Sequence, residues 1–239
     1  MRISASAVLV LVACHPGSDD AYPVIPQGDD SPITPRPDAP RADASGDAAT
    51  TISGRVCVIS DLRNLTSCTT ADASGISVEL SSGSATTIAD GSFTIAAAVG
   101  SNLTWSVTGT GYVQTVMPLG TIHLLPLVPT VVYQQLLLDN GVIQVAGEGS
   151  VVARVVRNDA PAVGVTATVT PPSQYGPLYD GASGVIWDQD MTAAAGVVWI
   201  PDVLQGAASL TLTAPSASPV TVSVPAFDQA ITFATVVIL

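Results

Sequence analysis

The sequence has little positive charge, and this limits the partners that the protein can bind. It contains no lysine and only seven arginines against 19 acidic residues, so its formal net charge is −12. Nucleic acids and anionic lipid surfaces are bound through basic faces, which this composition does not provide. We therefore predict that the protein has no nucleic-acid partner.

The sequence is also short of the side chains that most enzymes use. It has two histidines and three cysteines. His123 lies in the apolar, strand-like run "TIHLLPLV", which favours a structural role over that of a general base. No Ser-His-Asp or Cys-His arrangement is compelling, and the motifs of α/β-hydrolases, zinc peptidases, phosphate-binding loops and dinucleotide-binding folds do not occur. We predict a protein that is not an enzyme, with no catalytic residues, no metal site and no cofactor.

The N-terminus has the residue order of a bacterial export signal. Arg2 is followed by the apolar stretch Ile3 to Ala13, which is too short to span a bilayer. The sequence Leu11-Val-Ala-Cys14 resembles the lipobox of bacterial lipoproteins, which implies that residues 1–13 are a signal peptide and that Cys14 carries lipid. His15, in place of an aspartate, implies sorting to the outer membrane in that family. The alternative is an ordinary signal peptide with a cysteine there by chance.

Residues 14–50 have the composition of a disordered segment. Seven of the 19 acidic residues and seven of the 18 prolines fall in this segment. Such a sequence cannot bury enough apolar surface to offset the entropy that ordering would cost. We predict a solvated tether between the lipid anchor in the membrane and a folded body on the periplasmic side or at the cell surface.

From Thr51 onward the sequence alternates between apolar and polar residues, as β-strands do. The runs Ile76 to Leu80 and Leu103 to Val107 alternate cleanly, and the second places Trp105 on an inward face. Asp90-Gly91 stands between two such runs, as in a tight turn. Short strands separated by turns predict an all-β protein built as an antiparallel sandwich.

Four segments, "ISGRV", "GISVEL", "TTIADGSFTI" and "GTGYV", follow one another in an order that resembles a known module. They closely resemble the carboxypeptidase regulatory-like domain, a small sandwich of the transthyretin (prealbumin-like) type. The resemblance covers residues 51–128 and implies that the matching positions determine the fold and are not catalytic. In metallocarboxypeptidases this module accompanies a zinc catalytic domain, which does not fit in the rest of this chain.

The insert "CVISDLRNLTSCTTADAS" departs from the pattern of that family and contains two of the three cysteines. With Cys14 assigned to lipid, Cys57 and Cys68 remain in an exported domain, where disulfides persist. We predict that these two cysteines form a disulfide, because a metal site would need more ligands than the insert offers.

Residues 142–239 are predicted to form a second, divergent sandwich of the same type. Gly149-Ser-Val151 matches the first strand of the first domain, Gly164-Val165 matches the segment "GISVEL", and Ala195-Gly196 stands in place of Asp90-Gly91. The fold expected is therefore two tandem antiparallel sandwiches.

Between these domains, residues 129–141 predict one short linker helix. Thr130 is a candidate N-cap, and Gly141 is a candidate stop signal after Asn140. Tyr133 and the leucines that follow it would pack the helix against a domain. The alternative is an edge strand through Val131 to Tyr133.

The most informative functional patch is the loop-like stretch 171–190, which mixes aromatic and polar residues. The candidate ligand-binding residues are Tyr175, Tyr179, Trp187, Trp199, Asp188 and Asp190. Trp199 joins them because it lies between Val198 and Ile200, in the outward phase of its strand. The rings could stack on a sugar or a peptide, or they could cover the edge of the sandwich. The two aspartates favour a solvated loop over a weak calcium site.

These features predict a non-enzymatic, lipid-anchored protein of the bacterial cell envelope that acts as a structural or protein-interaction module. The alternative is a carbohydrate-binding lipoprotein that uses the aromatic loop of the second domain. A third hypothesis is an accessory subunit of an exported peptidase or transporter. The expected partners are the membrane, through the lipid anchor, and an envelope protein or a polysaccharide.

Overall fold

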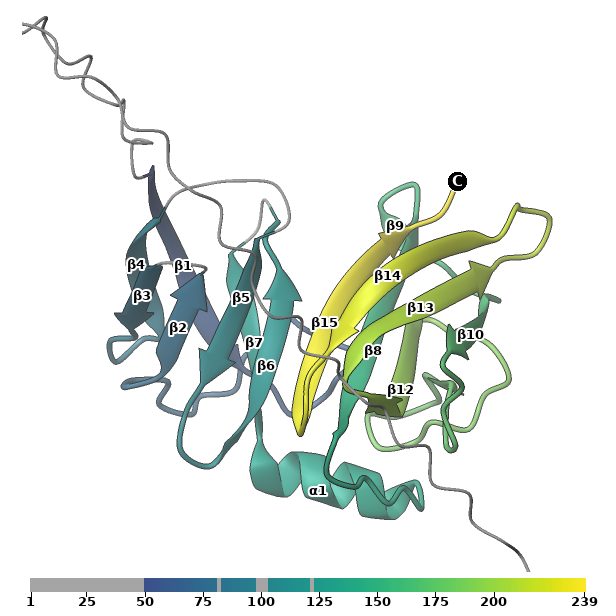
Figure 1. The fold of residues 1–239 in the computed structure, drawn as a ribbon, viewed down its shortest axis with the longest axis horizontal. Helices are drawn as coiled ribbons and strands as arrows, with labels where there is room; N and C mark the ends of the chain where they lie inside the picture. Colours follow the sequence, from purple (N-terminus) through teal and green to yellow (C-terminus); the bar gives the residue numbers. More distant parts are fainter. Residues whose placement is uncertain (1–49, 81–82, 98–102, 121–122) are drawn as a thin grey trace, which may run out of the picture. The chain divides into compact units, whose positions relative to one another are not determined.

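Strands make up most of the part of the chain that the structure describes, which is residues 50–80, 83–97, 103–120 and 123–239. This computed structural model confirms the predicted all-β class (Figure 1). Within these ranges there is one helix, α1 (Thr130–Asp139), and no helix is long and apolar enough to cross a membrane. The predicted signal peptide, Cys14 and the tether up to residue 49 lie outside the described residues.

The first half of the described chain forms two layers of strands around a hydrophobic core. Its strands are β1 (Thr50–Val58), β2 (Ser77–Leu80), β3 (Gly83–Thr86), β4 (Ser92–Ala97), β5 (Thr104–Thr108), β6 (Tyr112–Pro118) and β7 (Leu124–Pro129). One layer has the order β4-β1-β7 and the other β3-β2-β5-β6, and the β6–β7 pair connects them. Alternate residues of both layers fill the core, with Trp105 fully buried as predicted.

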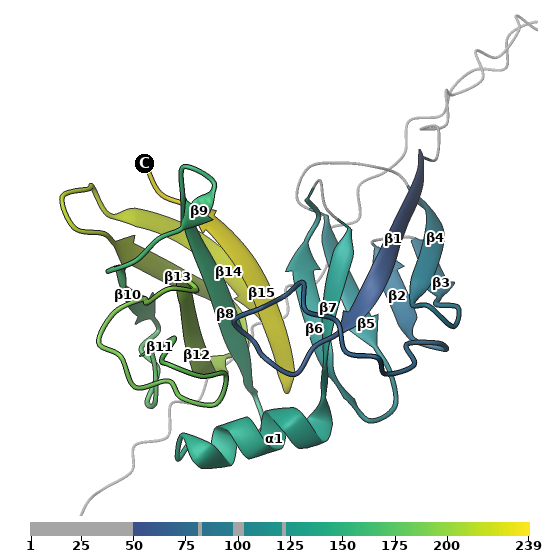
Figure 2. The same ribbon diagram turned by 180° about the vertical axis from the view of Figure 1, so that it is seen from behind.

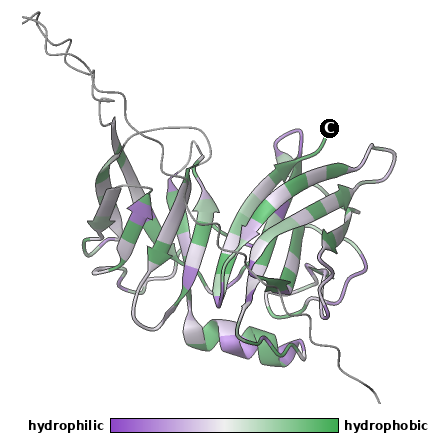
Figure 3. Ribbon diagram, viewed as in Figure 1, coloured by the Kyte–Doolittle hydropathy of each residue, from purple (hydrophilic) through white to green (hydrophobic). Residues whose placement is uncertain are grey.

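The second half repeats this two-layered construction. Its strands are β8 (Glu148–Arg157), β9 (Ala160–Pro161), β10 (Thr166–Thr170), β11 (Leu178–Tyr179), β12 (Val197–Leu204), β13 (Gly206–Thr213), β14 (Val220–Ala226) and β15 (Ala230–Val237). One layer has the order β11-β12-β8-β15, with β9 beside β8, and the other is the separate sheet β10-β13-β14. Apolar residues alternate with polar ones along β13, whose inward residues pack against β12 and β8 (Figure 3).

A short strand pair and a shared core join the two halves. Strand β15 pairs in parallel with β6 over three residues, which makes one sheet of 12 strands (Figures 1 and 2). A further hydrophobic cluster draws on the loop after β1, on α1 and on β12. The described residues from Thr50 onward accordingly form a single compact unit. The division into tandem domains at 51–128 and 142–239 stays a prediction.

Each half contains the same arrangement of hydrogen bonds around a buried threonine. The Thr87 hydroxyl accepts a hydrogen bond from the Ile76 amide and donates one to the Ala73 carbonyl. The Thr192 hydroxyl likewise accepts from Val165 N, at 2.9 Å, and donates to the Ala162 carbonyl, at 2.7 Å. The second half therefore reproduces local structure of the first, although the two sequences share few residues.

The hydrogen bonds correct one element of the predicted repeat. Val56 N donates to Gly91 O in the first half, and Val155 N donates to Gly196 O in the second. Gly196 thus stands where predicted, but Val155 is the counterpart of Val56, and the predicted match at Gly149-Ser-Val151 is wrong. Gly149 is glycine for another reason, since a Cβ there would clash with the backbone oxygen of Phe227.

Replacing either buried threonine with valine is expected to lower the free energy of unfolding by about 1 to 3 kcal/mol. The substitution keeps the shape of Thr87 or Thr192 but leaves a buried amide and a buried carbonyl without partners. Chemical denaturation of both variants would measure the loss. Thr168→Val, on the exposed face of β10, is the matched control and should change stability by less than about 0.5 kcal/mol.

The loop after β1 and helix α1 confirm two further predictions. Cys57 and Cys68 form a disulfide with an S–S distance of 2.07 Å. The linker forms a helix, so the alternative of an edge strand through Val131 to Tyr133 is wrong. The predicted N-cap is also wrong, because Pro129 occupies that position without a side-chain cap and Thr130 is the first helical residue.

Candidate functional site

Most aromatic rings of the predicted ligand-binding patch lie inside the protein. Trp199 is 0% exposed, Trp187 and Tyr179 are buried, and Tyr175 is half-buried. The rings of Trp187 and Trp199 meet edge to face with their centroids 5.3 Å apart. Three of the four rings therefore pack in the interior and offer no exposed platform for stacking.

The outward orientation predicted for Trp199 is wrong because β12 is covered on both faces. Val198 and Ile200 face the core of the second half, whereas Trp199 faces the cluster formed with α1 and the disulfide loop. Alternation in sequence identifies an outward face only where that face meets solvent. Here the other face is filled by a segment from the first half of the chain.

Two buried carboxylates, Asp180 and Asp202, hold the stretch 171–195 in place, and Asp202 was not singled out from the sequence. Asp180 accepts hydrogen bonds from the amides of Ala193, Ala195 and Val197 at 2.8–3.1 Å. Asp202 accepts hydrogen bonds from the Ser173 hydroxyl and from amides of the same loop. A signal was present for Asp202, since it is an acidic residue inside the otherwise apolar strand "VVWIPDVL".

The two aspartates of the predicted patch lie at the surface. Asp188 and Asp190 are exposed, and Asp188 accepts a hydrogen bond from the side chain of Gln189 at 2.9 Å. Among the described residues no group of three or more His, Cys, Asp or Glu side chains is placed to hold a metal ion. The predicted patch is thus divided between interior rings and surface carboxylates.

His123 contacts the backbone of its own half. Its ring nitrogens lie 3.0 Å from the carbonyl oxygens of Ser53 and Gly120, and its ring meets Trp105 edge to face. These contacts fit the structural role predicted for this histidine.

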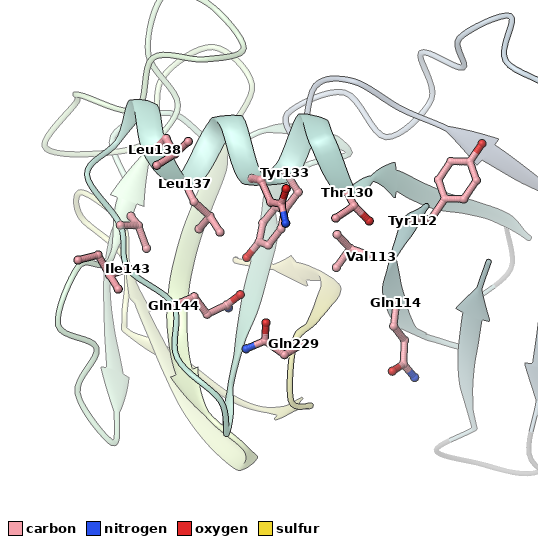
Figure 4. A pocket seen from close by; sticks show the side chains of 12 residues that line it. Tyr112, Val113, Gln114, Thr130, Tyr133, Leu137, Leu138, Ile143, Gln144 and Gln229 are labelled. Carbon is pink, nitrogen blue, oxygen red and sulfur yellow. The ribbon is translucent and has the colours of Figure 1, made fainter. Parts of the chain in front are cut away.

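An open groove of about 600 Å³ beneath helix α1 is a candidate site. We call it the α1 groove; it is lined by α1, by the start of β6, by the segment 142–144 and by the turn between β14 and β15. In Figure 4, Tyr133 and Leu137 point from the helix into this space, and Gln144 and Gln229 lie side by side below Tyr133. Its volume falls in the range of pockets that hold drug-sized ligands.

Glutamine side chains give the α1 groove its polar groups. The four are Gln114, Gln134, Gln144 and Gln229. Gln144 Nε2 donates to Pro201 O at 2.7 Å, Gln229 Nε2 to Val145 O at 2.9 Å, and Gln114 Nε2 to Ser106 Oγ at 3.0 Å. These bonds hold three amides in fixed positions, and each leaves the amide oxygen as an acceptor.

Behind the α1 groove, a network of hydrogen bonds leads into the interior. Ser150 Oγ accepts from Trp199 Nε1 at 3.2 Å and donates to Pro201 O at 3.1 Å, so the Tyr133 hydroxyl is left to donate to Ser150. Burial raises the pKa of Tyr133 to about 12. The network fixes the Tyr133 ring as a rigid part of the groove wall.

The raised pKa of Tyr133 predicts a loss of stability in alkali. Tyr133 is neutral in the folded protein up to about pH 12 and in the unfolded chain up to about pH 10. Its contribution to stability is therefore complete below pH 10 and falls by about 2 to 3 kcal/mol as the pH rises through 12. Chemical denaturation at several pH values from about 9 to about 12 would measure how the free energy of unfolding falls with pH. The variant Tyr133→Phe should lack this part of the slope, and an identical slope in both proteins would contradict the assignment.

Comparison of the whole chain with protein-family models and with curated proteins finds no match. The resemblance to the carboxypeptidase regulatory-like domain therefore stays a prediction.

Proposed function

We propose that this protein is a non-enzymatic, lipid-anchored binding module of the bacterial cell envelope, and that the α1 groove is its binding site. The observation that carries the proposal is the groove itself, with its fixed amides and apolar walls. Pockets that combine apolar walls with a few well-placed polar groups are the usual form of small-molecule sites. The groove replaces the stretch 171–190 as the place of binding.

The anchor in this proposal rests on the apolar run that ends at Cys14 and on the proline- and aspartate-rich segment that follows it. A lipid on Cys14 would hold the protein at the membrane, because each buried methylene contributes about 0.8 kcal/mol. The segment between Cys14 and β1 would then let the folded body reach ligands away from the lipid surface.

Lipidation predicts that Cys14→Ala abolishes both acylation and membrane attachment. Cells that express the native chain or the variant would be grown with radioactive palmitate and then fractionated. We expect label and sedimentation with membranes for the native chain, and neither for the variant. Equal labelling of both proteins would contradict lipidation at Cys14. It would not bear on the proposed binding site in the α1 groove.

Binding through the α1 groove can be tested by blocking its rim. Ile143 lines the groove and is 69% exposed, so Ile143→Arg would fill the entrance without disturbing the core. The matched control is Val163→Arg, at a residue that is 65% exposed and does not line the groove. Val163 follows β9 by two residues, and β9 lies at the opposite end of the second half from α1 (Figure 2). After crosslinking on intact cells and affinity capture, the native chain and the control should recover the same envelope component, and Ile143→Arg should not. Recovery by all three proteins would contradict the proposal.

A structural or protein-interaction role is the second candidate, and the surface around α1 favours it. Val131 and Leu138 on the helix and Val185 on the neighbouring loop are exposed apolar residues. Clustered exposed apolar residues mark protein contacts more often than single ones do. In the capture experiment, loss of one envelope protein from Val131→Gln, at an exposed residue outside the α1 groove, but not from Ile143→Arg, would favour this role over the groove.

A further inference from the structure

We infer that the α1 groove binds a neutral oligosaccharide. This inference rests on the proposed function and names the class of ligand for the same site. It follows from three properties of the groove: the charge of its lining, the hydrogen-bonding groups that its amides leave free, and the shape of its apolar walls.

The lining of the α1 groove carries no charge in the part of the chain that the structure describes. Its twelve residues are tyrosine, glutamine, threonine, valine, leucine and isoleucine. An ionic ligand would lose hydration there without meeting an opposite charge, which is strongly unfavourable. An anionic ligand would also be repelled by a protein with a net charge of −12. The ligand should therefore be uncharged.

The fixed amides require a ligand that is rich in hydroxyl groups. Gln114, Gln144 and Gln229 each use an N–H to hold their own position, which leaves an amide oxygen for a ligand. Gln114 and Gln229 also keep a second N–H, whereas that of Gln144 is directed at the Tyr133 oxygen. Sugar hydroxyls both donate and accept, so they can satisfy both groups of an amide. A purely apolar ligand would displace water from these oxygens without replacing its hydrogen bonds, and binding would be weaker.

The apolar parts of the groove suit the carbon faces of sugar rings. Val113 lies at the β6 end and Leu137 at the α1 end, whereas the ring of Tyr112 is directed away from this space (Figure 4). A ring that packs on an aromatic or aliphatic side chain keeps its hydroxyls directed outward, toward groups such as the amides. The Tyr133 hydroxyl takes no part in this, since it is buried and bonded to Ser150. With a volume of about 600 Å³ the groove has room for a short oligosaccharide.

The test is a panel of soluble glycans presented to the full-length protein in a detergent without a sugar headgroup. The neutral probes are gluco-, manno- and N-acetylglucosamine oligosaccharides, and the acidic probes are uronic-acid and phosphorylated oligosaccharides. Titration calorimetry should show binding to at least one neutral probe and to no acidic one. The double variant Gln144→Met/Gln229→Met should bind that probe about tenfold more weakly, because two amide contacts are lost.

Two further variants keep the test informative if the double variant is unstable. Ile143→Arg should abolish glycan binding at an unchanged melting temperature, because its side chain is exposed at the rim. Gln205→Met, at an exposed glutamine outside the groove, should bind as the native chain does.

Each other outcome overturns the inference in an identifiable way. Binding of acidic glycans alone, or of no glycan at all, would show that the class of ligand is wrong. If no neutral glycan binds but Ile143→Arg fails to recover the envelope component in the capture experiment, the proposed binding function stands and only the class of ligand is wrong. Neutral glycan binding that survives both the double variant and Ile143→Arg would place the site elsewhere on the protein.

Discussion

Replacing Trp199 with alanine is expected to lower the free energy of unfolding by about 3 to 5 kcal/mol, the range for a buried tryptophan. The indole is fully buried, packs against Trp187 and donates a hydrogen bond to Ser150. Its loss would open a cavity between the two halves of the described chain, where α1 and the disulfide loop also pack. Chemical denaturation would give the change in free energy, and the melting temperature should fall by about 10 °C.

Ile88→Ala serves as the control for this variant. Ile88 is a large apolar residue at the surface, so its truncation should cost less than about 0.5 kcal/mol. A loss of less than about 1 kcal/mol for Trp199→Ala would mean that the ring is not part of the core. Such a result would instead support the prediction from the sequence that Trp199 stacks on a ligand.

The second large effect is expected for Asp180→Ala, which should destabilise the protein by about 3 to 5 kcal/mol. The carboxylate is 1% exposed and accepts three backbone hydrogen bonds from residues 193–197. Without this carboxylate three backbone amides lose their partners. Each buried amide without a partner costs about 1 to 3 kcal/mol, and this cost is smaller where the loop can move so that water reaches the amide. Denaturation would measure the loss, and limited proteolysis should show cleavage within residues 181–195.

Asp190→Ala is the matched control for Asp180→Ala. Asp190 is an exposed aspartate of the same loop, and its replacement should change stability by less than about 0.5 kcal/mol. Equal stability of the two variants would contradict the conclusion that Asp180 organises this stretch.

Several predictions that depend on short stretches of sequence were confirmed, although the N-cap predicted at Thr130 was not. Alternation places Trp105 in the core, and Asp90-Gly91 forms a turn in which Asp90 Oδ1 accepts from Ser92 N at 2.9 Å. Cys57 and Cys68 pair because they are close in sequence within one insert. Each of these features is determined by neighbours within about a dozen residues, so the local pattern contains most of the information.

Two other predictions failed because they depend on contacts between distant segments. Trp199 is covered by a loop and a helix that lie far away in sequence, so alternation along β12 could not reveal its burial. Gly149 is glycine because the turn after β14 passes beside it, which made it a false match to the first strand of the other half.

The α1 groove could not be predicted for the same reason. Its glutamines come from β6, from α1, from the segment before β8 and from the turn before β15. Nothing in the sequence near any one of them indicates that they meet, and glutamine by itself is an ordinary surface residue. The pairing of β15 with β6 helps to bring the β14–β15 turn and the start of β6 to the same helix.

The most direct test of the proposed function is to place a photo-activated benzophenone side chain at position 143 in living cells. Position 163 serves as the control, since both residues are exposed and only Ile143 lines the α1 groove. On irradiation we predict an adduct with one envelope component at position 143 and none at position 163, whichever class of molecule that component is. No adduct at position 143, or the same adducts at both positions, would contradict the conclusion that the α1 groove is a binding site.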